Sequence, residues 1–159
     1  MPIPSSVSTR LEYQHKSLLD IIEGFSDEEI RRQVRPGKWS VFENIVHLQT
    51  YQHIFIGRVK QILEENNPSF GPYLAEADPN FHENCSRSSR EVIQDLITLR
   101  REIASGILSF KEVDFLKTGT HGRYGQMTLM LWIHFFLLHE AHHLYTIFQI
   151  CGELRKLRS

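Results

Sequence analysis

Two histidines near the end of the chain, His139 and His143, are separated by four positions. On an α-helix, residues at this spacing lie on one face about one turn apart, so both imidazole rings can reach a single ion. Imidazole is a common ligand of divalent transition metals. The pair therefore predicts a metal site whose remaining ligand comes from another part of the chain.

His47 is the best candidate for that third ligand. It lies in the middle of a helix predicted from Ser40 to about Asn66, on the apolar face with Leu48 and Tyr51. A polar ring buried there without a partner would cost roughly 1–3 kcal/mol, and a bound metal is one way to avoid that cost. Three neutral imidazoles leave coordination positions for water or substrate, which is typical of catalytic metal sites.

The elements that must position these residues are helices. Capping-box patterns at Ser26 and at Ser40 each mark the start of a helix, and Ser88 is expected to cap a further one. Gly152 is expected to end the last helix. No β pattern of useful length is visible. The last helix is apolar nearly all round, which indicates either the most buried helix or part of a dimer interface. The predicted helices cover 7–25, a short segment after Ser26, 40–66, 88–110 and 127–150, and the two long loops cover 67–87 and 111–126.

Length and helix number together predict an all-α, four-helix bundle with long crossover loops, formed by one domain over residues 1–159. Facing helices of such bundles commonly supply the ligands of metal sites. The loop at 67–87 is long for a small domain, so we expect it to serve as a lid or a wall.

The composition of the chain gives no sign that it binds nucleic acid or a membrane. The formal net charge of −1 gives no electrostatic footprint for nucleic acid, and basic pairs such as Arg100-Arg101 are interpreted as solvated helix faces. The longest apolar run, 127–138, is too short for a bilayer span, and no secretory signal is visible. The two cysteines form no C-x-x-C motif. A cytoplasmic setting without membrane contact is expected.

The sequence from His139 to His143 also matches the H-E-x-x-H motif of zincin proteases, in which Glu140 would be the general base. Zincins usually take a third ligand downstream of this motif, and only 16 residues follow His143 here. The β-sheet expected before a zincin helix is also missing from the pattern. A zincin-like hydrolase is therefore the less favoured alternative.

Two longer segments resemble the DinB-like superfamily. The stretch Pro36-Gly37-Lys38-Trp39-Ser40, followed by Glu43 and His47-Leu48, is similar to the start of the second helix in that family. The stretch 125–129, followed by His139 to His143 and Gln149-Ile150, is similar to its last helix. The resemblance covers nearly the whole chain.

This resemblance implies a four-helix bundle with long crossovers that binds one divalent metal, zinc or nickel. Carried over to this sequence, the implied metal ligands are His47, His139 and His143. Glu140 stands where relatives often carry Asp, so a supporting role beside the metal is less certain for it. Some relatives transfer a small thiol, such as bacillithiol, to an electrophile, and a related branch uses mycothiol. The resemblance also implies a homodimer.

The resulting hypothesis is a metal-dependent transferase acting on a small-molecule thiol and an electrophilic substrate. Arg58, Arg123 and Tyr124 are the candidate residues for binding an anionic substrate. A non-catalytic module that binds a metal or ligand is the alternative from another class, and it would use the same histidines. The sequence assigns no role to three further histidines, which are His15, His121 and His134. It also leaves open whether the loop at 67–87 is a lid or a wall.

Overall fold

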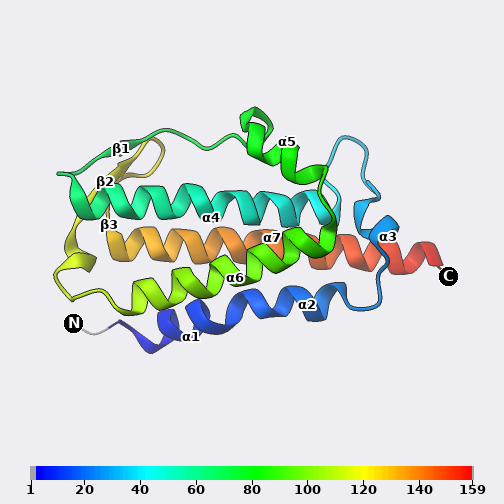
Figure 1. Ribbon diagram of the computed structural model, residues 1–159, viewed down its shortest axis with the longest axis horizontal. Coiled ribbons are helices and arrows are strands. Elements are labelled where there is room, and N and C mark those ends of the chain that lie inside the picture. Colours follow the sequence, from blue (N-terminus) through cyan, green and yellow to red (C-terminus); the bar gives the residue numbers. More distant parts are fainter. Residues whose placement is uncertain (1–2, 159) are drawn as a thin grey trace.

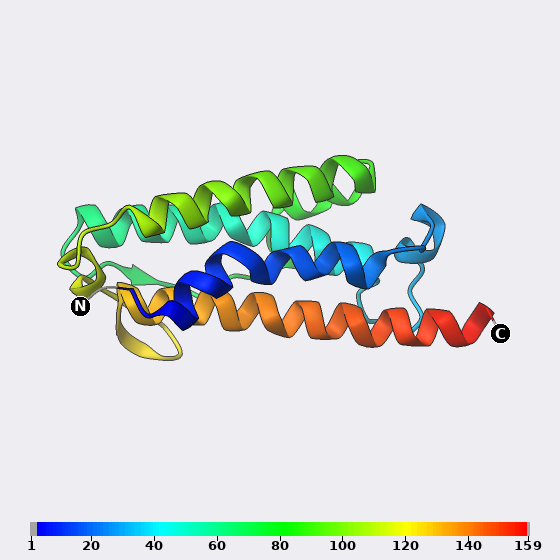
Figure 2. The same cartoon turned by 90° about the horizontal axis from the view of Figure 1, so that it is seen from below.

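The computed structural model describes residues 3–158 and has the predicted four-helix bundle architecture. The long helices are α4 (Val41–Glu64), α6 (Ser89–Leu108) and α7 (Leu129–Arg158). The fourth arm of the bundle is made of α1 (Ser5–Tyr13) and α2 (Ser17–Ile22), which follow one another along α6 and α7 (Figures 1 and 2). The helix α4 contacts both α6 and α7, so α4 and α7 can present side chains to each other.

Shorter elements join these helices. A turn of 3₁₀-helix, η1 (Gln14–Lys16), joins α1 to α2, and α3 (Asp27–Arg31) precedes α4. The 67–87 connection contains β1 (Ser69–Phe70), η2 (Ala75–Ala77) and α5 (Pro79–Cys85). The connection before α7 contains η3 (Asp114–Leu116), β2 (Thr118–His121) and β3 (Gly125–Thr128). In Figure 1, α5 and its connection pass over one side of α4.

The predicted helix starts are confirmed by their caps. The Ser40 side chain accepts a hydrogen bond from the Glu43 backbone N–H, and the Glu43 side chain accepts one from the Ser40 N–H. The same reciprocal bonds join Ser26 and Glu29 at the start of α3. These bonds satisfy N–H groups that the first helical turn otherwise leaves free, and they set where α4 begins.

The predicted bounds of the first and the last helix are wrong. The first helix is interrupted by η1 instead of running from 7 to 25. The last helix starts at Leu129 and continues through Gly152 to Arg158. Its extra turns are held by tertiary contacts, because Leu154 is buried and the Arg158 guanidinium binds the Glu29 carboxylate. Packing of this kind outweighs the weak preference of a helix to end at glycine.

The structure also contains a small sheet, although no β pattern of useful length is visible in the sequence. Strand β2 pairs antiparallel with β3 and parallel with β1, which gives a small three-stranded sheet at one end of the bundle. Gly119 fits between helix and sheet, since a Cβ there would lie 2.8 Å from the Ile62 side chain. The strands are two to four residues long, so no period-2 pattern could reveal them.

The apolar core consists of two clusters with a polar layer between them. One cluster includes Leu48 and Leu144 and lies toward the α3 end. The other includes Phe55 and Leu137 and lies toward the sheet. Between them, the facing helices bury histidine, arginine and glutamate side chains, and the candidate site lies in this layer.

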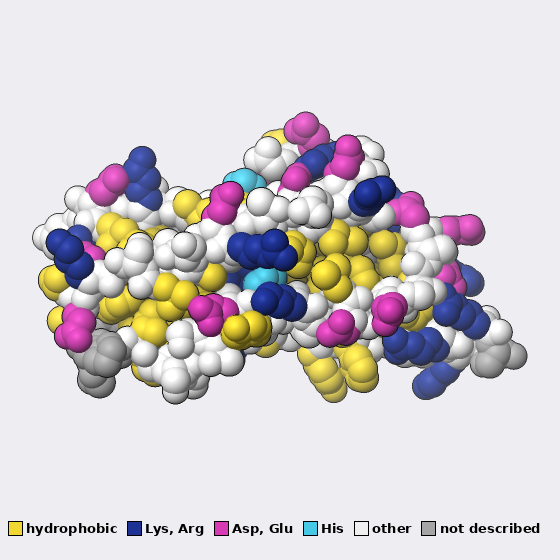
Figure 3. Space-filling model, turned by 60° about the horizontal axis from the view of Figure 1, so that its bottom comes forward, with side chains coloured by type: hydrophobic (Ala, Val, Ile, Leu, Met, Phe, Trp, Pro, Cys, Tyr) yellow, Lys and Arg dark blue, Asp and Glu magenta, His cyan; other side chains and the backbone are white. Residues whose placement is uncertain are grey.

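Charged side chains of both signs are scattered over the face drawn in Figure 3, with apolar side chains between them. No broad basic surface is visible on that face. Within residues 3–158, no helix combines the length and the hydropathy needed to cross a bilayer.

Candidate metal centre

The structure brings His47, His139 and His143 together in the polar layer. One nitrogen from each ring lies within 4.8 Å of the others. The Nε2 atoms of His47 and His139 are 2.9 Å apart. Because α4 supplies one ring and α7 two, the cluster depends on how these two helices pack.

Asn44, one turn before His47 on α4, holds the third ring in place. The Nδ1 of His143 donates to the Asn44 Oδ1 over 2.8 Å, while the Asn44 amide nitrogen donates to the Ser40 carbonyl. The second bond sets the orientation of the amide, so its oxygen faces His143. With a proton on Nδ1, the lone pair of His143 is on Nε2 and is available to a cation.

All three rings are neutral at physiological pH. Burial, with a smaller contribution from the nearby His143, lowers the pKa of His47 from 6.5 to about 3. Burial likewise lowers the pKa of His139 and that of His143 to about 3, with smaller contributions from neighbouring histidines. Neutral imidazole is the form that binds a metal.

Aromatic rings enclose the cluster. The Tyr51 ring lies 4.3 Å from the His139 ring, and the Trp39 ring lies 5.0 Å from the His47 ring, centroid to centroid. Tyr73, from the 67–87 connection, stacks on His47 at 5.8 Å. That connection therefore forms one wall of the site.

A hollow of about 340 Å³ lies beside the cluster. His143, Asn44 and Trp39 line its inner side, and Lys38 and His142 are at its exposed side. No ion pair of Lys38 is present among the described residues. The hollow gives a small molecule a path to His143.

The donor set fits a divalent transition metal. Imidazole nitrogens are ligands of zinc and nickel, and no Asp, Glu or Cys belongs to the cluster in residues 3–158. The buried Nδ1 atoms of His47 and His139 form no hydrogen bond there, and the Nε2 atoms of the two rings contact only each other among the hydrogen bonds of residues 3–158, so no other residue satisfies these rings. Three neutral ligands would leave the cation its full charge, which favours an anion as the next ligand.

Glu140 belongs to a different set of contacts, although it follows His139 directly. Its carboxylate forms an ion pair with Arg100, with Nε to Oε2 at 2.7 Å, and also accepts a bond from the Gln14 amide. Arg100 is buried and donates to the Leu11 carbonyl as well. The interpretation of Arg100 as a solvated residue is therefore wrong. Within residues 3–158, the hydrogen bonds of Glu140 reach no histidine.

The predicted substrate-binding residues lie toward the sheet. The Arg58 guanidinium is buried and donates to the Gly71 carbonyl at 2.8 Å. Arg123 and Tyr124 are exposed in the β2–β3 turn, and Tyr124 reaches His139 only through the intervening ring of Phe135. None of the three lines the hollow beside His143, and their role in binding stays a prediction.

The remaining histidines of interest do not join the cluster. His15 is buried, and neither of its ring nitrogens has a hydrogen-bond partner in the described chain. The Nδ1 of His121 accepts from the Arg123 backbone N–H, which gives that ring a structural role. His134 lies on α7, outside the metal cluster.

Sequence reasoning missed the role of Asn44 and of Lys38. Asn44 lies three positions before His47, so its position on the same helix face was a usable signal. Lys38 gave no such signal, because its place beside the cluster depends on how the loop before α4 folds back toward α7.

The chain matches the family model of the DinB superfamily over residues 10–147. It is similar to the uncharacterized protein YuaE of Bacillus subtilis (strain 168), with 28% identity over 140 residues that cover 77% of this chain and 83% of that protein.

Among solved structures, the fold is similar to that of YfiT from Bacillus subtilis, with a TM-score of 0.81 and 20% identity. The match covers 94% of this chain and 86% of the other. YfiT is described as a probable metal-dependent hydrolase with an unusual four-helix bundle topology. With the family model matching most of its length, this chain belongs to the DinB superfamily.

Proposed function

We propose that this protein is an enzyme that uses one divalent transition metal, zinc or nickel, bound by His47, His139 and His143. The observation that carries the proposal is the convergence of three buried, neutral imidazoles that lack a carboxylate partner. Buried polar atoms normally have hydrogen-bond partners, and the Nδ1 atoms of two of these rings have none in the described chain.

The reaction we propose is the transfer of a small thiol to an electrophilic substrate. His47, His139 and His143 would hold the cation, whose positive charge would lower the pKa of a coordinating thiol enough to make it a thiolate at neutral pH. The products are a new sulfur–carbon bond, the released leaving group and the thiol proton, which passes to solvent. Support comes from the uncharged donor set and from the resemblance to thiol transferases.

The residues around the histidines have separate tasks in this proposal. Asn44 keeps His143 in the tautomer that presents Nε2. Trp39 and Tyr51 limit the access of water to the cluster. Lys38, at the hollow beside His143, attracts the carboxylate of a small thiol such as cysteine or bacillithiol.

Hydrolysis is the second candidate, because the structurally similar YfiT is described as a probable metal-dependent hydrolase. A zincin mechanism needs a free carboxylate beside the metal. Glu140 is bound to Arg100 and Gln14, so it does not fill that role. A hydrolase built on this site would need another base, and the thiol reaction is therefore preferred.

The test compares two assays on protein loaded with zinc or nickel. One follows conjugation of monochlorobimane with cysteine, glutathione or bacillithiol, and the other follows hydrolysis of p-nitrophenyl acetate. We expect conjugation that is lost in His47→Ala and kept in the matched control His53→Ala, an exposed histidine of α4 outside both the cluster and the hollow. Conjugation by metal-free protein at the same rate would refute the proposal, and ester hydrolysis alone would favour the second candidate.

We also propose that two copies associate through the outer face of α7. Leu131, Leu138 and Tyr145 recur every seven residues and are 51%, 60% and 62% exposed. Between 129 and 151 the only Asp, Glu, Lys or Arg is Glu140, which faces inward. The α7 helix of a second copy could therefore pack on these three exposed side chains without burying a charge. In light scattering, Leu138→Glu should be a monomer. The control Leu116→Glu, which changes an exposed residue outside α7, should remain a dimer. A monomeric wild type would refute the proposed dimer.

A further inference from the structure

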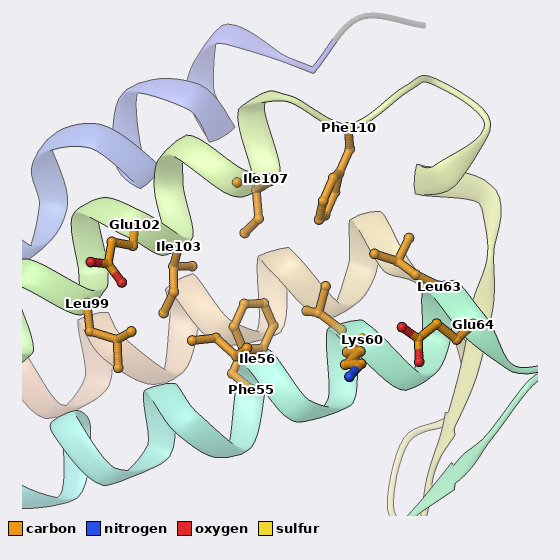
Figure 4. A pocket seen from close by; sticks show the side chains of 12 residues that line it. Phe55, Ile56, Lys60, Leu63, Glu64, Leu99, Glu102, Ile103, Ile107 and Phe110 are labelled. Atoms are coloured by element: carbon orange, nitrogen blue, oxygen red, sulfur yellow. The ribbon is translucent and has the colours of Figure 1, made fainter.

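A second concave site lies between α4 and α6, away from the histidines. It is a groove of about 310 Å³, at the lower end of the roughly 300–1,000 Å³ range of ligand pockets. Figure 4 shows Ile103 and Ile107 of α6 facing Phe55 and Ile56 of α4 across it, with Phe110 toward the end where the helices separate. Its walls are almost entirely apolar.

Gly106 lies in this wall, in the last turn of α6. Packing within the chain does not require glycine there, because a Cβ at Gly106 would meet no atom within 4 Å. The missing side chain leaves the groove open at this point.

The rim restricts what the groove can hold. Lys60, Glu64 and Glu102 border it, and no ion pair involves them within residues 3–158. A helix of a second copy laid across the groove would bury these charges without partners, at a high cost. A small molecule can fill the apolar floor and leave all three charges in water. Their net charge of −1 disfavours an anionic ligand.

We propose that this groove binds an uncharged, hydrophobic small molecule of about two aromatic rings. An engineered apolar cavity of about 150 Å³ binds benzene, and this groove has about twice that volume. Phe55 and Phe110 offer aromatic surfaces at its wall and at its open end.

The groove is separate from the candidate metal centre. Phe55 stacks on Phe136 with centroids 4.1 Å apart, and Phe136 in turn stacks on Tyr51, which contacts His139. This layer of rings stands between the groove and the histidines. A ligand in the groove does not reach the metal site, so its binding does not depend on the proposed enzyme activity.

The experiment measures binding of N-phenyl-1-naphthylamine, an uncharged two-ring fluorescent probe, to the full chain with and without added zinc. We expect saturable binding of one probe per chain in both samples. Gly106→Leu should weaken binding at least tenfold, because its side chain occupies the groove. The matched control Gly57→Leu adds the same side chain at an exposed glycine of α4 outside the groove, and should bind like wild type.

Thermal unfolding separates loss of binding from loss of fold. Leucine is a better helix former than glycine, so neither variant should melt below the wild type. Gly57→Leu, in the interior of α4, should melt about 2–4 °C above it. Absence of saturable binding to wild type would overturn the proposal, as would equal binding by a folded Gly106→Leu. Loss of binding in both variants, or a smaller oligomer for Gly106→Leu alone in light scattering, would also overturn it.

Discussion

Two buried polar clusters lie in the middle of the bundle, and they differ in how many of their polar atoms have hydrogen-bond partners. The pair Arg100 and Glu140 is fully buried and exchanges charge-assisted hydrogen bonds, with Gln14 and a backbone carbonyl completing the set. The histidine cluster, built around His139, leaves buried ring nitrogens without partners in the described chain. The two residues from α7, His139 and Glu140, are neighbours in sequence and face different sides of the helix.

The difference separates a structural site from a functional one. A buried ion pair whose hydrogen bonds are complete connects α7 to α1 and α6, and nothing remains for a ligand to bind. The Nδ1 atoms of His47 and His139, which have no hydrogen-bond partner in the described chain, cost free energy in the folded protein, and the Nε2 atoms of the cluster face one another where a cation could bind.

Removing one partner of the ion pair should have the largest effect on stability. Glu140→Ala leaves the Arg100 guanidinium buried without its carboxylate, and we expect a loss of about 3–5 kcal/mol in the free energy of unfolding. Urea denaturation of metal-free protein measures this loss. The double variant Arg100→Met/Glu140→Leu, which removes both charges, should recover most of it. A single variant as stable as wild type would show that the pair is not structural.

Metal binding should stabilise the protein through the other cluster. At a free zinc or nickel concentration 100 times Kd, the expected gain in the free energy of unfolding is about 2.7 kcal/mol. His139→Ala should abolish this gain, while His53→Ala, at an exposed histidine of α4, should keep it. Differential scanning calorimetry with and without metal measures the change, and an equal gain in His139→Ala would contradict the assignment.

Acid should destabilise the protein partly through His15, the other buried histidine without partners. Burial and the nearby positive charges of Arg100, Lys16 and Arg101 lower its folded-state pKa from 6.5 to about 4. Below pH 6.5 the unfolded chain takes up a proton that folded His15 refuses, so stability falls as pH drops toward 4. Between pH 7 and pH 5 wild type should lose about 2 kcal/mol more than His15→Leu. Equal losses in urea titrations of both would disprove this.

Replacing a site histidine in metal-free protein should have the smallest effect. His47→Leu removes a ring that has no hydrogen bond at Nδ1 and fills the space with apolar atoms. We expect the free energy of unfolding to change by no more than about 1 kcal/mol, with either sign. A loss comparable to that of Glu140→Ala would mean that the histidines form a structural cluster.

The main features of the bundle follow from local signals in the sequence. The Ser40–Glu43 capping box starts α4 where it was predicted, and helical spacing places His47 and the His139–His143 pair on inward faces. These features depend on residues within one turn of each other, so one helix at a time is sufficient to find them.

What sequence reasoning missed depends on contacts between distant segments. The extension of α7 to Arg158 rests on Glu29 in α3, and the partner of Arg100 lies 40 positions away. The short strands form only because β1 and β2 are brought together by the helices between them. The H-E-x-x-H pattern was also misleading about Glu140, because the partner that removes it from the site lies on another helix.

The most direct test of the central claim is elemental analysis by mass spectrometry of untagged protein purified without chelators. Wild type, His47→Ala and His143→Ala are measured together, with His142→Ala as the control. We predict close to one zinc or nickel ion per chain in wild type and in the control, and loss of the metal in both site variants. A wild-type protein that holds no metal even after reconstitution would contradict the account and leave the three histidines as core residues.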